Sequence, residues 1–171
     1  RDRPEEQNRY LQLLRGQLVD GMLLYMVPGS EDELRKLVEA RKPLVLMGRV
    51  PVTFKADLVA IDHVTASRMA VAHLISRGHR RIGIIPGPDR QPFSRTRVEG
   101  WRQALIAAGI EVDERLVSHG DYPVEGGQIA LSRLLDLPGP PTAVLAGNFH
   151  EVVGVPRVLR QRRIGRPGGS K

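Results

Sequence analysis

The sequence predicts an α/β fold built on parallel sheets, and two observations support that prediction. Helix-like and strand-like segments alternate along nearly the whole chain of 171 residues. Parallel strands need crossover connections, and helices are the usual ones. The strand-like segments are short apolar runs, as expected of strands that helices cover on both faces. In such sheets, ligands bind in the loops at the carboxyl ends of the strands.

The first part of the chain shows a clear helix signal before each of its first two apolar runs. Tyr10, Leu14 and Leu18 have helical spacing, and Ser30 followed by Glu33 has the pattern of a capping box. The predicted elements are helix 5–17, strand 19–27, helix 30–41, strand 43–48 and strand 57–62.

The second part continues the alternation. Gly78 should end a helix, because glycine adopts the left-handed conformation at low cost. Ser94 is a plausible N-cap for a helix with an apolar stripe at Val98, Trp101, Leu105 and Ala108. Pro156 is expected to break or kink the last helix. The predicted elements are helix 64–77, strand 81–87, helix 94–108, strand 115–120, helix 123–136, strand 142–147 and helix 150–163.

Composition narrows the functional classes. The chain has no cysteine, which fits a reducing compartment, and neither a membrane-length apolar run nor a signal-peptide pattern. The net charge of +7 is concentrated after residue 150, where six cations accompany one acid. A DNA-binding face would spread its basic charge, so this end is interpreted as a solvated or disordered segment, with phosphate binding as the alternative.

Enzyme and metal motifs are missing from the sequence. It has no nucleophile elbow, Walker loop or dinucleotide-binding glycine pattern, and "HEVVG" at 150–154 lacks the second histidine of a zincin. The five histidines show no ligand spacing. We therefore expect a protein that is not an enzyme and that has no metal site and no cofactor.

The segment "FSRTRVEGWRQALIAAGI" carries the sharpest local signal. Arg95 and Arg97 fall in the first turn of the predicted helix, where the helix dipole disfavours cations by ~0.3–1 kcal/mol each. They could be solvated, or paired with Asp89 or Glu99. Alternatively, Arg97 offers its planar fork to the hydroxyls or carboxylate of a ligand in a strand-end cleft.

Six segments together resemble a known family. "VDGMLL", "PLVLMGR", "VAIDHVTASRMAVAHLISRGHRRIGIIPGP", "RVEGWRQALIAAGI", "GDYPVEGGQIALSRLL" and "PPTAVLAGN" have the order and spacing seen in the ligand-sensing domain of LacI/GalR-type transcription regulators. The resemblance covers about residues 4–148. It implies a two-lobed, periplasmic-binding-protein-like (type I) fold with a sugar or similar effector between the lobes.

The resemblance also implies domain bounds and site residues. It predicts a partial first lobe over 1–61, a partial second lobe over 62–150 and a divergent basic tail over 151–171. Arg97 matches an arginine that contacts effector hydroxyls in this family, and Asn148 matches an asparagine at the cleft end of a strand. Three further residues are expected at the crossover or in the pocket wall: Asp62, Gln91 and Phe93. Phe93 would suit stacking on a sugar ring, and the alternative is a hydrophobic anchor of the loop.

The sequence departs from the family at three places. Phe149 stands where the family usually has Asp, and Pro156 lies inside the following helix. The helix-turn-helix segment, the first strand-helix-strand and the last strands of the family have no counterpart in these residues. We therefore expect a chain truncated at both ends, which on its own binds sugars weakly or not at all.

The leading interpretation is the effector-binding domain of a cytoplasmic, homodimeric regulator that contacts DNA only through a segment outside this chain, with no membrane contact. The alternatives are the solute-binding protein of a sugar transporter and a truncated product without its own function.

Overall fold

The computed structural model describes residues 3–16, 19–48, 54–120 and 124–164. The chain folds into two compact units, Arg1–Ile61 and Asp62–Lys171. Both contain parallel strands joined through helices, so the predicted α/β class is confirmed.

The first unit is a three-stranded parallel sheet in the order β1-β2-β3. Its elements are α1 (Pro4–Arg15), β1 (Met22–Tyr25), α2 (Glu31–Glu39), β2 (Leu44–Met47) and β3 (Asp57–Val59). Side chains of both helices and of one sheet face form a single core that includes Leu11, Leu34, Leu37, Leu44 and Leu46.

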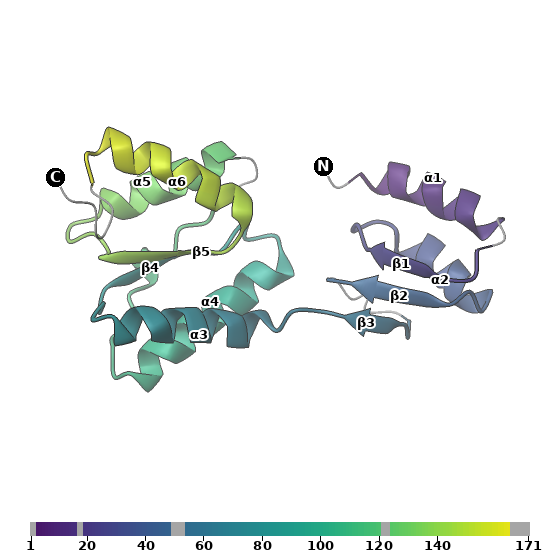
Figure 1. The fold of residues 1–171 in the computed structure, drawn as a ribbon, viewed down its shortest axis with the longest axis horizontal. Helices are drawn as coiled ribbons and strands as arrows, with labels where there is room; N and C mark the ends of the chain where they lie inside the picture. The colour runs from purple at the N-terminus through teal and green to yellow at the C-terminus, as the bar shows by residue number, and fades with distance from the viewer. Residues whose placement is uncertain (1–2, 17–18, 49–53, 121–123, 165–171) are drawn as a thin grey trace. The chain divides into compact units, whose positions relative to one another are not determined.

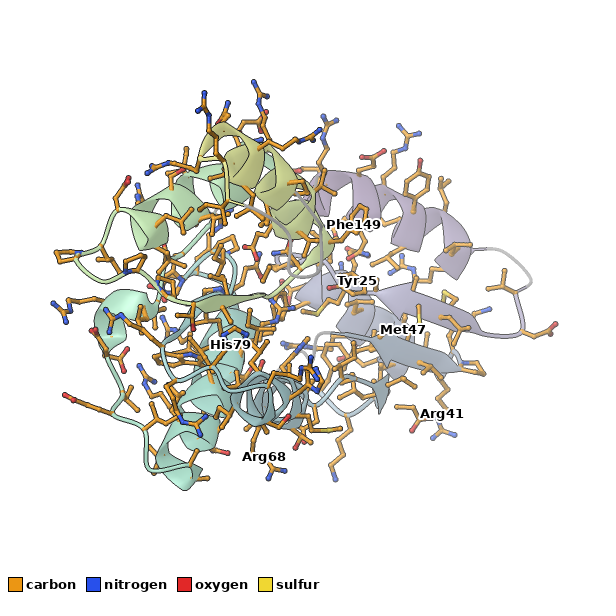
Figure 2. The ribbon with its side chains drawn as sticks, turned by 60° about the vertical axis from the view of Figure 1, so that its left-hand side comes forward. Tyr25, Arg41, Met47, Arg68, His79 and Phe149 are labelled. Carbon is orange, nitrogen blue, oxygen red and sulfur yellow. The ribbon has the colours of Figure 1, made fainter. Side chains whose placement is uncertain are left out.

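The other face of this sheet is exposed. Leu23 is 69% exposed and Val59 is 64% exposed, and Tyr25 and Met47 lie on the same face (Figure 2). Successive side chains of a strand point to opposite faces, so β1 and β2 each turn one apolar row to the core and another away from it, whereas all three residues of β3 are exposed. The prediction that helices cover both faces is therefore wrong for the described part of this unit.

The second unit has helices on both faces of a two-stranded parallel sheet (Figure 1). Ile82 and Ile84 of the first of these strands pack in one core with α3 and α4, and Ile85 packs in another with α5 and α6. The elements are α3 (His63–Ser76), β4 (Ile82–Ile85), α4 (Pro92–Ala107), the 3-10 helix Glu114–Leu116, α5 (Val124–Leu135), β5 (Ala143–Ala146) and α6 (Phe149–Gln161).

Glycines bring both helix pairs of this unit into close contact. A Cβ at Gly100 of α4 would overlap the Val64 carbonyl oxygen of α3. On the opposite face of the sheet, a Cβ at Gly127 of α5 would lie 2.6 Å from Glu151 Cα of α6. Each helix pair therefore requires a residue without a side chain at its crossing point.

Most predicted elements are present, and α3 ends before Gly78 with φ +95° as expected. The strand predicted over 115–120 is wrong. Asp113 caps the 3-10 helix by accepting from the Arg115 N–H, and only Val117 forms an isolated bridge with β4 in this stretch. The local cap offers the backbone an alternative to strand pairing.

Two predicted helix caps also differ from expectation. Helix α4 begins at Pro92, which suits a first helical position, so Ser94 lies inside the helix and is not its N-cap. Ser30 makes no side-chain cap bond, and Glu33 pairs with Lys36 instead.

The last helix bears on two further expectations, of which the break at Pro156 is wrong. It continues through Pro156, and its residues Glu151 and Val158 are buried. The described part of the segment predicted as a basic tail over 151–171 is thus mostly a packed helix, and residues 165–171 lie outside the described residues.

Candidate ligand-binding site

The carboxyl ends of β4 and β5 lie at one edge of the second unit, because the strands are parallel and in register from Ile82↔Ala143 to Ile85↔Ala146. The Gly147 N–H extends the pairing with a 2.8 Å bond to the Ile85 carbonyl. Beyond β4, residues 86–88 form a buried loop in which Gly87 has φ +104°. That conformation favours glycine, and it keeps the space above the backbone open for side chains of α4 and α6.

Arg97 reaches this loop from α4. Its Nη1 donates a 2.9 Å hydrogen bond to the Pro86 carbonyl, its one protein hydrogen bond within the described residues. The guanidinium carbon lies 5.2 Å from the centroid of the Phe93 ring, within cation–π range. A Cβ at Gly147 would lie 3.0 Å from Arg97 Cδ, so glycine is needed there too. The side chain is therefore held at the strand ends, and its remaining N–H groups can donate to a ligand.

Asn148 reaches the same loop from the start of α6. Its Oδ1 caps the helix by accepting from the Glu151 N–H at 3.1 Å, which fixes the side chain. A Cβ at Gly87 would lie 3.0 Å from Ser94 Oγ, 3.6 Å from Arg97 Nη1 and 3.7 Å from Asn148 Nδ2. Three polar groups from two helices therefore converge on Gly87.

The convergent groups include buried atoms with spare hydrogen-bonding capacity. Ser94 Oγ, Asn148 Nδ2 and Glu151 Oε1 are buried without a hydrogen-bond partner of good geometry in the described part of the chain. Leaving such a group unpaired costs about 1–3 kcal/mol. A structure tolerates that cost most readily where a ligand or water can satisfy the group.

Glu151 is the buried acid of this cluster. The side chain is only 1% exposed, and its Oε2 accepts a 3.2 Å bond from the Gly147 N–H. Burial raises the pKa of Glu151 to about 7, although Asn148, the Gly147 N–H and the charge of Arg97 oppose the rise. The carboxyl therefore changes its protonation state near neutral pH.

Two histidines border the cluster. The His63 ring centroid lies 5.5 Å from that of Phe93, and burial, followed by the positive charge of Arg97, lowers the pKa of His63. His119 contacts the Gly87 carbonyl through Nδ1 at 3.0 Å, and its Nε2 lies 4.0 Å from the Asp89 carboxylate.

The residues predicted from the sequence have different places in this arrangement. Arg97, Asn148 and Phe93 lie together, although Phe93 belongs to the first turn of α4 rather than to a loop. Gln91 is the N-cap residue of α4 and lies just outside the helix. Asp62 caps α3, where its Oδ1 accepts a 3.0 Å bond from the Thr65 N–H, and this bond lowers the pKa of Asp62. Since α4 starts at Pro92, Arg97 lies in its second turn and not in its first, contrary to expectation.

Sequence reasoning missed the buried groups Ser94, Glu151 and His63. The spacing of Glu151 with Gly154 and Val158 could have indicated the first two turns of a buried helix face. No comparable signal marked Ser94, because its burial depends on where α4 begins.

The arrangement offers hydrogen-bond donors, a planar cation and an aromatic ring, which together suit a polar ligand rich in hydroxyls. The described residues contain no group of three acidic, histidine or cysteine side chains able to hold a metal ion. Nor does any helix in the described ranges have the length and apolar character needed to cross a membrane.

Comparison with known proteins assigns this architecture to one family. A family model for periplasmic binding proteins and the sugar-binding domain of the LacI family matches residues 1–166. The HTH-type transcriptional repressor CytR of Escherichia coli K12 is 36% identical over 143 residues, which cover 82% of this chain and 41% of the repressor. The HTH-type transcriptional regulator CelR of Thermobifida fusca is 40% identical over 150 residues, covering 86% and 44%.

A solved structure shows the same relationship. The complex of the transcriptional regulator CelR with cellobiose has a TM-score of 0.74 and 38% identity to this chain, covering 92% of it and 49% of the regulator. The chain therefore spans less than half the length of each of these relatives. They are transcriptional regulators, which agrees with the expectation of a protein that is not an enzyme.

Proposed function

Because this chain belongs to the family of periplasmic binding proteins and LacI-type sugar-binding domains, we propose that it binds a sugar or related polyol at the carboxyl ends of β4 and β5. Arg97 donates to ligand hydroxyls through its planar fork, and Asn148 donates through its amide. Gly87 leaves the space that the ligand needs, and Phe93 supplies an apolar surface.

One observation supports this proposal above the others. The Arg97 guanidinium and the Asn148 amide approach the same glycine from two helices, at 3.6 Å and 3.7 Å from the position of a Cβ there. Both helices are fixed by packing on the sheet, so the donors are preorganised and lose little entropy on binding. Gln91 and Asp62 are proposed as outer contacts of the ligand.

In this proposal, the ligand shifts the affinity for DNA of a segment outside the 171 residues. Such coupling requires the ligand to prefer one of two conformations of the regulator. We further propose that the protein acts in the cytoplasm as a homodimer, as expected of a regulator that reads chromosomal DNA. The first unit represents part of one lobe and the second unit part of the other.

Cellobiose is the first ligand to test, because the CelR complex contains it. Its effect on the melting temperature of the chain should be measured at millimolar concentrations, with sucrose at the same concentration as the control for a general osmolyte effect. Because the chain is expected to bind sugars weakly, the additional increase with cellobiose should be small, and we expect Arg97→Ala to remove it.

Two variants separate binding from folding. Arg97→Lys keeps the charge but loses the planar fork, so it should also lose the cellobiose effect. Arg95→Ala removes an arginine of the same helix whose side chain is 75% exposed, and it should keep the effect. An unchanged cellobiose effect in Arg97→Ala would exclude the proposed role of Arg97.

A further inference from the structure

Glu151 forms hydrogen bonds with Gly147 and Asn148, the two residues that precede α6. Its side-chain Oε2 accepts from the Gly147 N–H at 3.2 Å, and its backbone N–H donates to Asn148 Oδ1 at 3.1 Å. The Gly147 N–H also donates to β5's partner strand at Ile85, so the turn is tied to the sheet and to α6 together. The Glu151 carboxyl therefore contacts the residue before Asn148, and the Asn148 side chain also interacts with the carboxyl.

The packing around Glu151 leaves room for this carboxyl through two glycines. A Cβ at Gly127 of α5 would lie 2.6 Å from Glu151 Cα, and a Cβ at Gly120 would lie 3.1 Å from Oε1. Oε1 itself is buried and has no hydrogen-bond partner of good geometry in the described ranges, although the nearby Asn148 side chain favours the charged carboxyl. The carboxyl thus occupies a close-fitting space in which its second oxygen is left unsatisfied.

Favourable interactions offset only part of the cost of burying the charged Glu151 carboxylate. Among the described residues, the Glu151 carboxyl faces one charged group from a neighbouring element, Arg97 of α4. Gly127 of α5 and Gly120, which also pack against Glu151, carry no charge. Burial outweighs the favourable interactions and raises the pKa of Glu151 to about 7.

We propose that Glu151 is a positioning residue that acts through Asn148 and makes the donors of the ligand site depend on a proton. With the proton bound, the Asn148 amide is available to a ligand. Without it, the buried carboxylate attracts the Asn148 amide and the Arg97 guanidinium, because hydrogen bonds to a charged acceptor are about twice as strong as neutral ones. Ligand binding then weakens as the proton is lost.

The side-chain amide of Asn148 gives a direct test that needs no ligand. In the ¹⁵N-labelled chain, we expect the Asn148 side-chain NH₂ and the Gly147 N–H resonances to shift together between pH 5 and pH 9. The midpoint should lie near the pKa of about 7. Glu151→Gln keeps an acceptor for the Gly147 N–H but cannot ionise, so it should abolish both shifts.

Two outcomes of the resonance titration would overturn the proposal. His63 and His119 also border the site, and shifts that persist in Glu151→Gln would show that a group other than Glu151 causes them. Resonances that do not move in the unsubstituted chain would exclude a proton-dependent turn. Glu125→Gln, which neutralises an exposed acid in the first turn of α5, is the matched control and should leave both shifts unchanged.

Stability provides a second measurement. The ordinary pKa of Glu151 is 4.5, and its pKa in the folded chain is raised to about 7. At pH values between these two, Glu151 is protonated to a greater extent in the folded chain than in the unfolded chain. The free energy of unfolding should therefore decrease as the pH rises through this window and then level off. Glu151→Gln should remove the part of this decrease that comes from the site, and Glu125→Gln should not.

The ligand part of the proposal rests on the proposed function and is measured with cellobiose by calorimetry. The protonated fraction of a group with a pKa of about 7 falls about tenfold between pH 6 and pH 8, so Kd should rise about tenfold over that interval. Glu151→Gln should bind equally at both pH values. A Kd that does not depend on pH in the unsubstituted chain overturns the proposal. Absence of sugar binding in both proteins counts against the proposed function, and the resonance titration then decides the role of Glu151.

Discussion

The two units bury their parallel sheets to different extents. In the second unit, all four residues of β4 are buried between the pair α3 and α4 and the pair α5 and α6. In the described part of the first unit, α1 and α2 share one core with a single sheet face, and the other face has exposed residues such as Leu23 and Val59. Parallel sheets usually have both faces covered.

The difference shows how the same kind of sequence pattern can have different structural consequences. β1 and β4 are both short apolar runs, and each predicts a buried strand. Within the described residues, only the second unit has helices on both faces, and on each face a glycine lets the two helices approach closely. The proposed site lies on this fully covered unit, where rigid packing can hold Arg97 and Asn148 in place.

Gly100→Ala should have the largest effect, because it should lower the stability of the second unit and leave the first unit unchanged. Alanine has the higher helix propensity by about 1 kcal/mol, so an unconstrained position would be stabilised. The new methyl group would instead overlap the Val64 carbonyl oxygen and lie 2.9 Å from Ser67 Cβ. Separation of α3 from α4 should lower the stability of the second unit by about 3 kcal/mol.

Amide hydrogen exchange can assign this loss to one unit. Protection should decrease in β4 and α4 and remain unchanged in β1 and α2. Glu99→Ala, at an exposed neighbouring position of the same helix, is the control and should have little effect. A Gly100→Ala protein more stable than the parent would show that the two helices do not meet at this glycine.

Gln7→Ala should have an intermediate effect, and it tests the edge of the first unit. The Gln7 amide donates to the Tyr25 carbonyl at 2.7 Å and accepts from the Val27 N–H at 2.8 Å. These are bonds that a neighbouring strand would otherwise make with β1. Their loss should cost about 1 kcal/mol or slightly more, measured as faster exchange of the Val27 amide and lower stability of the first unit.

A charged isostere sharpens the Gln7 test. Gln7→Glu keeps the acceptor for the Val27 N–H but places a carboxylate oxygen against the Tyr25 carbonyl oxygen, which repels it, so its effect should be at least as large as that of Gln7→Ala. Arg9→Ala, at an exposed position on the same helix, should leave the exchange of the Val27 amide unchanged. Equal effects of all three variants would mean that the amide does not support the strand edge.

The sequence was sufficient for the element order, because helix and strand periodicities differ and Gly78 marks a helix end. It was not sufficient for the 3-10 helix before Val117, where a local cap by Asp113 competes with strand pairing. The family motif pointed to Arg97 and Asn148, whose side chains lie together at Gly87, and their role in ligand binding stays a prediction. The burial of Ser94 could not be predicted, because it depends on where α4 begins, and the close contact of Glu151 with Gly120 joins parts of the chain that are distant in the sequence.

Leu23→Thr should have the smallest effect on stability and tests whether the second face of the first sheet is exposed. Leu23 is 69% exposed, and threonine suits a strand, so the free energy of unfolding should change by no more than about 0.5 kcal/mol. Leu24 points to the opposite, core-facing side, and Leu24→Thr should cost about 1–2 kcal/mol. Exposed apolar surface promotes association, so Leu23→Thr should also reduce self-association in sedimentation velocity experiments. Equal destabilisation by the two substitutions would show that both faces of the sheet are buried in solution.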